Sequence, residues 1–453
     1  MKRGGIIALA MGLLLTMTGC NLAGDVRQHL QPPRLTGEQQ AVQEALDAYL
    51  SVGEQTKESR LKYPKNGENR AAIWMTDMDG DGTEEAVAFY TVGQDEMVHI
   101  HLLHRNEDDT WKSVGDIVGN STEVDEVVLA DLDGDGGKEL LVGWTMYTGV
   151  DKQLVVYTDT DTGLMPVVGN LLYTAFTVEN MTQYARDDLL VLRADTVAGV
   201  TAVTLQTIEN GAVKTVSEAR LDGYIQGFTD VRMAPLSDEV NALYIDCYKD
   251  ASTMLTELVF WNGEELVAPF YNTNTNLTTA PVRELPLTAT DVNRDGKLEV
   301  PVCRRLPGYE SATAAGAQWL IAWNAWDLQS ATQVASTTVF HCIINMTDGY
   351  YFRLDDQFVT VNEHGDAEVS VTASYNAGDR EWTLSEFKNG KIGRKILVIR
   401  AVETNVADDD KKNDKKFTTV AESHEKQLEY QVWINEAATD LDIRKVTYQI
   451  VEW

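Results

Sequence analysis

Acidic side chains recur in a nine-residue frame at three points of the chain, and their spacing suits a divalent cation. In each copy an oxygen-bearing side chain stands at places 1, 3, 5 and 9, and glycine stands at place 6. Calcium binds oxygen ligands in a geometry loose enough for a short loop, and place 7 can add a backbone carbonyl. The predicted ligands are Asp77, Asp79, Asp81, Thr83 and Glu85 in the first copy, Asp131, Asp133, Asp135, Gly137 and Glu139 in the second, and Asp291, Asn293, Asp295, Lys297 and Glu299 in the third.

The alternative interpretation of these strings is a plain hairpin turn, which Asp-Gly sequences also form. Glycine at place 6 fits both interpretations, because glycine reaches positive φ at low cost. The glutamate that recurs at place 9 of all three copies favours calcium, and we expect up to three Ca²⁺ ions, one per loop. Asn293 and Arg294 give the third copy one charge fewer and a nearby cation, so its affinity should be weaker.

Short runs of β-branched and aromatic residues follow each loop and predict strands. An EF-hand would need a bidentate glutamate at place 12, where this chain has Ala88, Val142 or Val302. The loops therefore join two strands of a sheet. They resemble the calcium loops of FG-GAP/VCBS repeats, the β-propeller blades of integrin α-chains and many bacterial surface proteins. The resemblance covers residues 70–342 and implies a calcium-binding propeller, without implying a ligand.

The spacing of the copies predicts the architecture. Asp77 and Asp131 are 54 residues apart, and Asp131 and Asp291 are 160 apart, close to three such periods. Two units without the acidic frame should lie between them, with loops near Asn180 and Met233 that bind no calcium. Four strands in each period predict a mainly β fold, a β-propeller of about five four-stranded blades. Six or seven blades remain open, and a β-helix is the alternative.

The first residues resemble a targeting segment. Lys2 and Arg3 precede an apolar run, residues 6–15, that is shorter than the about 20 residues needed to cross a bilayer. Met17–Cys20 is similar to a bacterial lipobox, which implies removal of residues 1–19 and lipidation of Cys20. The alternatives are a plain secretory signal and a retained signal anchor. In each case we expect an extracytoplasmic protein, and the lipobox implies a lipid anchor in the bacterial cell membrane.

Three further segments flank the repeats. Residues 20–36 are short and polar and predict a tether. Residues 37–52 predict one amphipathic helix, since Thr36 and Gln39 form a capping box and apolar residues follow at helical spacing. Residues 349–453 contain no acidic frame and predict a separate α+β module.

Composition excludes some partners and leaves others open. The formal net charge of −32 argues against nucleic acid and anionic lipid as ligands, and we expect a monomer. With Cys20 lipidated, three cysteines remain, and neither a disulfide framework nor a zinc pattern is present. Cys303 and Cys342 are predicted to be either a disulfide or buried free thiols.

No catalytic constellation is recognisable. His99 and His101 alternate along a predicted strand, which suits either a transition-metal pair or the polar face of an outer strand. Trp319, Trp323 and Trp326 suit either carbohydrate and peptide contacts or the packing between blades.

The sequence therefore predicts a binding or scaffold module for an unidentified extracellular protein or glycan, and not an enzyme. The alternative is an extracytoplasmic carbohydrate-active hydrolase or lyase with its site in the propeller funnel. A convergent pair of carboxylates outside the calcium loops, or a histidine with a carboxylate, would favour that alternative.

Overall fold

The computed structural model describes residues 37–51, 58–146, 152–160, 162–167, 169–361, 367–404, 417–437 and 448–450. The predicted signal segment, the tether and Cys20 lie outside these residues. The chain divides into two compact units, Met1–Glu123 with Asp159–Leu164 and Val124–Thr158 with Met165–Trp453. No helix among the described residues is long and apolar enough to cross a membrane.

The first unit contains helix α3 (Gly37–Leu50) and one antiparallel sheet, sheet 1. The sheet has the order β1-β3-β4-β5, and β2 pairs with the same edge of β3 as β1 does. Val42 and Leu46 of the helix are fully buried and share a core with sheet 1. The strands are β1 (Ser59–Leu61), β2 (Ile73–Thr76), β3 (Glu85–Val92), β4 (His99–Arg105) and β5 (Trp111–Val118).

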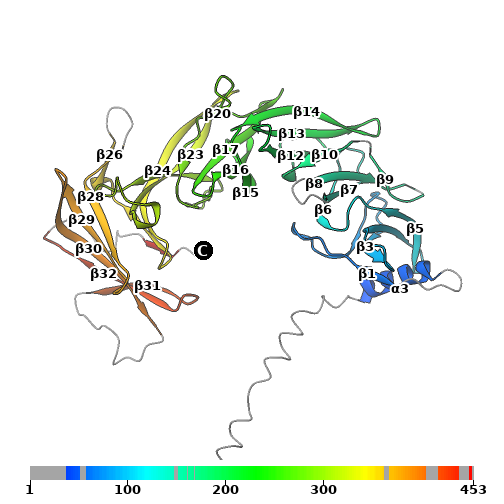
Figure 1. The fold of residues 1–453 in the computed structure, drawn as a ribbon, viewed down its shortest axis with the longest axis horizontal. Helices are drawn as coiled ribbons and strands as arrows, with labels where there is room; N and C mark the ends of the chain where they lie inside the picture. The colour runs from blue at the N-terminus through cyan, green and yellow to red at the C-terminus, as the bar shows by residue number, and fades with distance from the viewer. Residues whose placement is uncertain are drawn as a thin grey trace, which may run out of the picture. The chain divides into compact units, whose positions relative to one another are not determined.

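The second unit continues with three more antiparallel sheets in chain order (Figure 1). Sheet 2 comprises β6 (Val124–Ala130), β7 (Glu139–Thr145), β8 (Lys152–Thr158), β9 (Met165–Pro166) and β10 (Leu171–Tyr173). Sheet 3 comprises β11 (Ala175–Glu179), β12 (Asp188–Asp195), β13 (Val200–Glu209) and β14 (Ala212–Leu221). Sheet 4 comprises β15 (Gly227–Pro235), β16 (Asn241–Asp250), β17 (Thr253–Trp261), β18 (Leu266–Val267) and β21 (Val282–Arg283), and a small hairpin joins β19 (Tyr271–Asn272) to β20 (Leu277–Thr278).

Sheet 5 has the order β22-β23-β24-β25-β33. The strand that would precede its loop is reduced to an isolated bridge between Thr290 and Glu299. Pairing between β24 and β25 carries this sheet past residue 342, where we predicted the repeats to end. Its strands are β22 (Glu299–Arg305), β23 (Trp319–Ser330), β24 (Gln333–Asn345), β25 (Tyr350–Leu354) and β33 (Tyr448–Ile450), with the 3-10 turn η1 (Ala314–Gly316) before β23.

Consecutive sheets of the second unit pack face to face. Sheets 2 and 3 share one hydrophobic core, sheets 3 and 4 share a second, and sheets 4 and 5 share a third. The central strands carry apolar residues on both faces, which is why β7 and β12 each begin, and β16 contains, a run of five or six consecutive buried residues. This is the blade organisation of a β-propeller, and it confirms the mainly β prediction. Sheet 3 has the four strands expected of a blade, whereas sheets 1, 2, 4 and 5 each have five.

The predicted helical part of residues 349–453 is wrong for the described residues. They form strands and one 3-10 turn, η2 (Asp356–Phe358), because β-branched residues such as Thr418, Thr419 and Val420 favour a pleated strand. The strands are β26 (Val359–Val361) and β27 (Ala367–Val369), and then one sheet of β28 (Val371–Asn376), β29 (Glu381–Lys388), β30 (Lys391–Glu403), β31 (Thr418–Ser423) and β32 (Leu428–Ile434). That sheet shares a core with sheet 5.

Candidate metal centre

Each of the three acidic loops ends on the first residue of a strand. Glu85 opens β3, Glu139 opens β7 and Glu299 opens β22. The strand before each loop pairs antiparallel with that strand, through β2, β6 and the Thr290 bridge respectively. The loops therefore join two neighbouring strands of a sheet, as the sequence predicted.

Carboxylate and amide oxygens fold each loop through a repeated set of backbone hydrogen bonds. In the second loop the place-1 carboxylate accepts the N–H groups of places 4 and 6, at 2.6 and 3.1 Å. The place-3 carboxylate accepts the N–H of place 5 at 3.1 Å, and the place-5 carboxylate accepts that of place 7 at 2.8 Å. The first and third loops repeat these bonds. The loop conformation is thus specified by the same side chains that are the predicted ligands.

Places 4 and 6 adopt left-handed backbone conformations. In the second loop Gly134 has φ of 83° and Gly136 has φ of 95°. Glycine adopts these angles without the Cβ clash that other residues incur. Place 4 of the third loop is Arg294, with φ of 66°, so that loop keeps the conformation at a steric cost.

The glutamate at place 9 is buried in all three loops, with relative exposures of 3 % for Glu85, 4 % for Glu139 and 0 % for Glu299. Its Oε2 accepts the backbone N–H of place 2, from Met78 at 2.8 Å, Leu132 at 2.8 Å and Val292 at 2.9 Å. Burial raises the pKa of each glutamate, and that of Glu139 reaches about 7 because the carboxylates of Asp133, Asp135 and Asp131 add to the effect.

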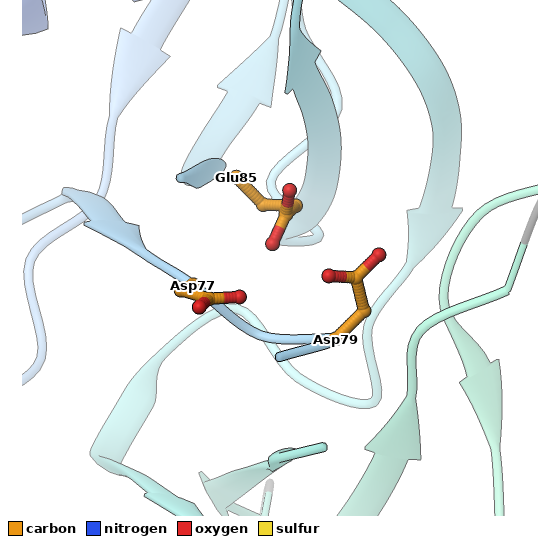
Figure 2. A group of neighbouring side chains, drawn as sticks. All are labelled: Asp77, Asp79 and Glu85. Atoms are coloured by element: carbon orange, nitrogen blue, oxygen red, sulfur yellow. The ribbon is translucent and has the colours of Figure 1, made fainter. Parts of the chain in front are cut away.

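Carboxylates of places 1, 3 and 9 converge in the first and second loops. The ligand oxygens of Asp77, Asp79 and Glu85 all lie within 4.8 Å of one another, as do those of Asp131, Asp133 and Glu139. Figure 2 shows the side chains of Asp77 and Asp79, from the loop, directed toward Glu85 at the start of β3. Both clusters could hold a metal ion.

The third loop has the same backbone fold, but an amide replaces one of the three carboxylates that converge in the first two loops. Asn293 occupies place 3, and its amide nitrogen donates to Asp295 Oδ2 at 2.9 Å and to Glu299 Oε1 at 3.1 Å. The amide thus bridges the carboxylates of places 5 and 9 where the other loops have a third carboxylate.

The predicted ligands at places 5 and 7 lie outside the two converging clusters. Asp81 and Asp135 each accept the N–H of place 7, from Thr83 and Gly137. The negative charge of Asp135 still raises the pKa of Glu139. In the third loop the ammonium group of Lys297 donates to Asp327 Oδ1 on β23 at 3.0 Å, so place 7 could contribute only its backbone oxygen.

Residues distant in sequence also reach the loops, and sequence reasoning missed them. In the first unit, His104 Nε2 lies 3.3 Å from Asp159 Oδ2, and the charges of both groups act on Glu85. In the second unit, Asp187 contacts the backbone of Asp131. The partners are 55 and 56 residues apart, so no local pattern could have revealed them.

The two loops that lack the acidic frame close in other ways. Asp188 opens β12 and accepts the N–H of Thr182 at 2.6 Å, which repeats the role of the place-9 glutamate. In sheet 4 the backbone of Leu236 and Val240 closes the turn, with an N–H···O distance of 2.8 Å. Sheets 3 and 4 therefore keep a loop between the same two strands, but these loops lack the converging carboxylates of the acidic loops.

His99 and His101 lie on β4 and both approach Asp116 of β5. The Nδ1 atoms lie 2.9 and 3.4 Å from the carboxylate, which also accepts the hydroxyl of Tyr90 at 2.8 Å. His101 is fully buried, with its ring centroid 4.5 Å from that of Tyr49. The pair therefore belongs to a buried hydrogen-bonded network, in which each Nδ1 faces a carboxylate.

The tryptophans and cysteines of sheet 5 are core residues. Trp319 and Trp323 lie in one hydrophobic cluster and Trp326 in another, so the packing interpretation holds. Cys303 on β22 and Cys342 on β24 are both in register with Ile321 of the strand between them. Two strand spacings separate them by about 10 Å, too far for a disulfide. Both are free thiols.

Asp222, which follows β14, and Glu257 on β17 form a buried carboxylate pair outside the acidic loops. Glu257 accepts the N–H of Asp222 at 3.1 Å and the hydroxyl of Thr278 at 3.0 Å, while Lys249 donates to Asp222 at 2.9 Å. Burial raises the pKa of Glu257 to about 7. Both carboxylates therefore have hydrogen-bond partners within the fold, and we interpret them as structural groups.

Comparison with known proteins gives distant structural likenesses only. No family model matches the chain, and no curated protein sequence matches it. The exotype rhamnogalacturonan lyase YesX is 10 % identical with a TM-score of 0.29, over 84 % of this chain and 73 % of that one. The Dos1 propeller is 10 % identical with a TM-score of 0.32, over 74 % and 80 %. Sqt1 from Chaetomium thermophilum is 12 % identical with a TM-score of 0.29, over 71 % and 83 %. Likenesses at these scores establish neither a ligand nor an activity.

Proposed function

We propose that this protein is a calcium-stabilised, lipid-anchored β-propeller that acts at the bacterial cell surface as a binding or scaffold module. The observation that carries the proposal is the convergence of three carboxylates in each of two loops, within 4.8 Å. Such charges repel one another unless a cation lies between them. The raised pKa of Glu139 reflects burial together with this repulsion.

Calcium suits the donor set better than other common cations. The clusters contain carboxylates alone, whereas transition metals favour imidazole and thiolate ligands. Magnesium demands a near-octahedral shell and retains water, while calcium tolerates the looser geometry of a short loop. Carbonyl groups at place 7 and the carboxylates at place 5 would complete the shell. The Asn293 loop would be a third and weaker site.

The bound ion would act on stability rather than on chemistry. Each loop joins two neighbouring strands, so a cation bound to place 1 and place 9 ties the end of one strand to the start of the next. A ligand that binds only the folded state raises the free energy of unfolding by mass action. Because the ion would have a structural role, the rest of the blade surface would be available to bind a partner, an extracellular protein or glycan.

The anchor and the binding role are supported by sequence resemblance. Met17–Cys20 is similar to a lipobox, and the three loops resemble those of FG-GAP/VCBS repeats in surface proteins. A net charge of −32 would keep the folded body away from an anionic membrane surface, which suits a domain held by a tether.

Thermal unfolding tests the calcium proposal. Residues 37–453 should unfold many degrees higher in millimolar calcium than in chelator, and magnesium should not reproduce the rise. Asp133→Asn and Asp135→Asn should each reduce the rise. Asp108→Asn is the matched control, because Asp108 caps the hairpin turn between β4 and β5 through Thr110. An identical melting temperature in calcium and chelator would overturn the proposal.

Metabolic labelling tests the anchor separately. The full chain expressed in a bacterium should incorporate labelled fatty acid and partition with membranes, and Cys20→Ser should abolish both. Wild-type protein that carries no fatty-acid label and is released into the medium would contradict the lipid anchor without affecting the calcium proposal.

A further inference from the structure

A groove of about 430 Å³ opens between sheets 2 and 3, both in the second unit. Its volume lies within the range of pockets that bind small molecules, roughly 300–1,000 Å³. Strands β12, β13 and β14 form its floor and walls, and the segment of Asn170, Leu171 and Leu172 at β10 forms the opposite side. The acidic loops contribute no lining residue, so this site is separate from the metal centre.

The floor follows one face of β13. Val200, Ala202, Thr204 and Gln206 alternate along the strand and therefore project to the same side of sheet 3. Val203 and Leu205, between them, point into the core that sheets 3 and 4 share. Three of these four floor residues have small side chains, and the smallest, Ala202, lies near the centre of the floor.

Two arginines flank that small residue. Arg193 on β12 and Arg220 on β14 are both in register with Ala202, so they stand on either side of it, about 10 Å apart at the backbone. Arg193 Nη2 lies 3.2 Å from Asp195, and Arg220 Nε lies 3.0 Å from Glu218. The other N–H groups of both guanidinium groups have no partner among the described residues. Each arginine therefore keeps donors available to a ligand.

The charges of the lining balance. Arg193 and Arg220 offset Asp195 and Glu218, so a charged ligand would meet a repelling group beside each attracting one. Guanidinium groups donate two parallel N–H bonds, and carboxylates accept two bonds from adjacent hydroxyls. Adjacent hydroxyls that both donate and accept are the chemistry of a sugar ring.

The apolar part of the lining fits the same ligand. Val191 and Ala202 provide a hydrocarbon surface on sheet 3, and Leu171 provides one on the opposite side of the groove. The C–H face of a sugar ring can pack on such a surface while its hydroxyls meet the polar wall. We propose that this groove binds a neutral mono- or disaccharide. The assignment rests on the proposed function and deepens it by naming the ligand class.

Saturation-transfer difference NMR on the calcium-loaded protein tests the assignment. The probes are glucose, galactose, maltose, cellobiose and lactose, with galacturonate as the anionic comparison. At least one neutral sugar should give transfer signals, and galacturonate should bind more weakly than galactose. Ala202→Leu fills the centre of the floor without changing a charge and should abolish binding of that sugar.

Single arginine variants test the polar wall. Arg193→Ala and Arg220→Ala should each weaken the sugar about tenfold or more, because each removes hydrogen bonds from a charged donor. Lys214→Ala is the matched control, since Lys214 pairs with Glu209 elsewhere on the β13–β14 hairpin. The affinity of the Lys214→Ala variant for the sugar should equal that of the wild type.

The outcomes separate this inference from the calcium proposal. No signal from any neutral sugar, tighter binding of galacturonate, or unchanged binding in Ala202→Leu would each overturn the groove assignment. The calcium-induced rise in melting temperature is measured on the same samples. If it persists while sugar binding fails, only the groove assignment is wrong; if the rise is absent, the calcium proposal is wrong.

Discussion

Asp187 holds the backbone of Asp131 from the neighbouring sheet. Its Oδ2 accepts the N–H of Asp131 at 3.0 Å, and its own N–H donates to the Asp131 carbonyl at 2.8 Å. The first residue of the second acidic loop is therefore fixed by the loop of sheet 3. Gln183 of that loop donates in turn to the carbonyl of Glu239 in sheet 4, at 2.7 Å. Consecutive loops of the second unit are linked at one end of their sheets.

We expect Asp187→Ala to weaken calcium binding at the second loop although Asp187 is not a predicted ligand. Losing the acceptor frees the Asp131 backbone, at a cost of about 1–2 kcal/mol, which lowers affinity roughly five- to thirtyfold. Isothermal titration measures the effect. Asp187→Asn keeps an oxygen acceptor and should bind as the wild type does; equal loss in both variants would point to charge rather than position.

Loss of the proton from Glu139 should make the calcium-free protein less stable as pH rises. Its pKa is about 7 in the folded protein against an ordinary value of 4.5. Between those values the folded state binds more protons than the unfolded state, so stability is present at low pH and is lost as pH rises through the folded pKa. In chelator the melting temperature should fall from about pH 5 to about pH 8, and saturating calcium should remove the fall.

Glu139→Gln isolates the contribution of that group. The variant should show a smaller fall in chelator and should exceed the wild type in stability at about pH 8, while gaining less from calcium. A wild-type slope that is unchanged in Glu139→Gln would assign the pH dependence to other groups.

Replacing the amide of the third loop should create a stronger calcium site. Asn293→Asp substitutes a carboxylate for the amide that donates to Asp295 and Glu299, and it restores the carboxylate set of the first two loops. Ligand charge tunes calcium affinity, and about tenfold tighter binding at this site is expected. Titration of Asn293→Asp against Asn293→Ser, which adds no charge, measures the gain.

The thiols of sheet 5 should resist alkylation in the folded protein. Burial raises the pKa of Cys303 and that of Cys342 to about 12, and the thiolate is the reactive form. Iodoacetamide should leave both unmodified at about pH 8 and should modify both after denaturation, as mass spectrometry would record. A reductant should leave the melting temperature unchanged; a drop would indicate a disulfide and contradict the register.

Asp348 should be essential for the stability of the second unit. Its buried carboxylate accepts Arg380 Nε at 2.8 Å, Asn345 Nδ2 at 2.9 Å and the Tyr375 hydroxyl at 2.9 Å. Asp348→Ala leaves these donors unpaired, and breaking a buried pair costs about 3–5 kcal/mol. Urea denaturation measures the loss.

The exposed pair of Arg394 and Glu386 gives the control for Asp348. The two side chains lie 3.0 Å apart on the C-terminal sheet, with Arg394 mostly exposed. Arg394→Ala should cost less than about 1 kcal/mol. A similar loss in both variants would show that the contacts of Asp348 contribute no more than a surface ion pair.

Local periodic signals made the acidic loops and the repeated sheets predictable. The place-9 glutamate could be recognised because its spacing from place 1 is fixed, although its burial could not be read from the sequence. Helix α3 followed from a capping box and helical spacing, and it ends at Leu50, two residues before the predicted end. These features depend on residues that are close together in the chain.

Features set by distant residues escaped prediction. Asp187 and Asp159 have no local pattern, because their partners belong to other elements. The groove beside Ala202 depends on strand register, which sets Arg193 and Arg220 opposite one alanine. In the C-terminal region polar, charge-rich stretches obscured the alternation of β31, and pairing with β32 determines its conformation.

Sheet 5 cannot be completed until its edge strand β33, near the end of the chain, has been synthesised. Tyr350 of β25 pairs with Ile450, 100 residues later in the chain (450 − 350). At a synthesis rate of about 5–20 residues per second, that edge waits roughly 5–20 s for its partner. An unpaired strand edge recruits strands of other chains. Slower translation of the last quarter of the messenger RNA therefore leaves the β25 edge unpaired for longer. A larger share of the chains should then associate with one another on the ribosome instead of folding as monomers.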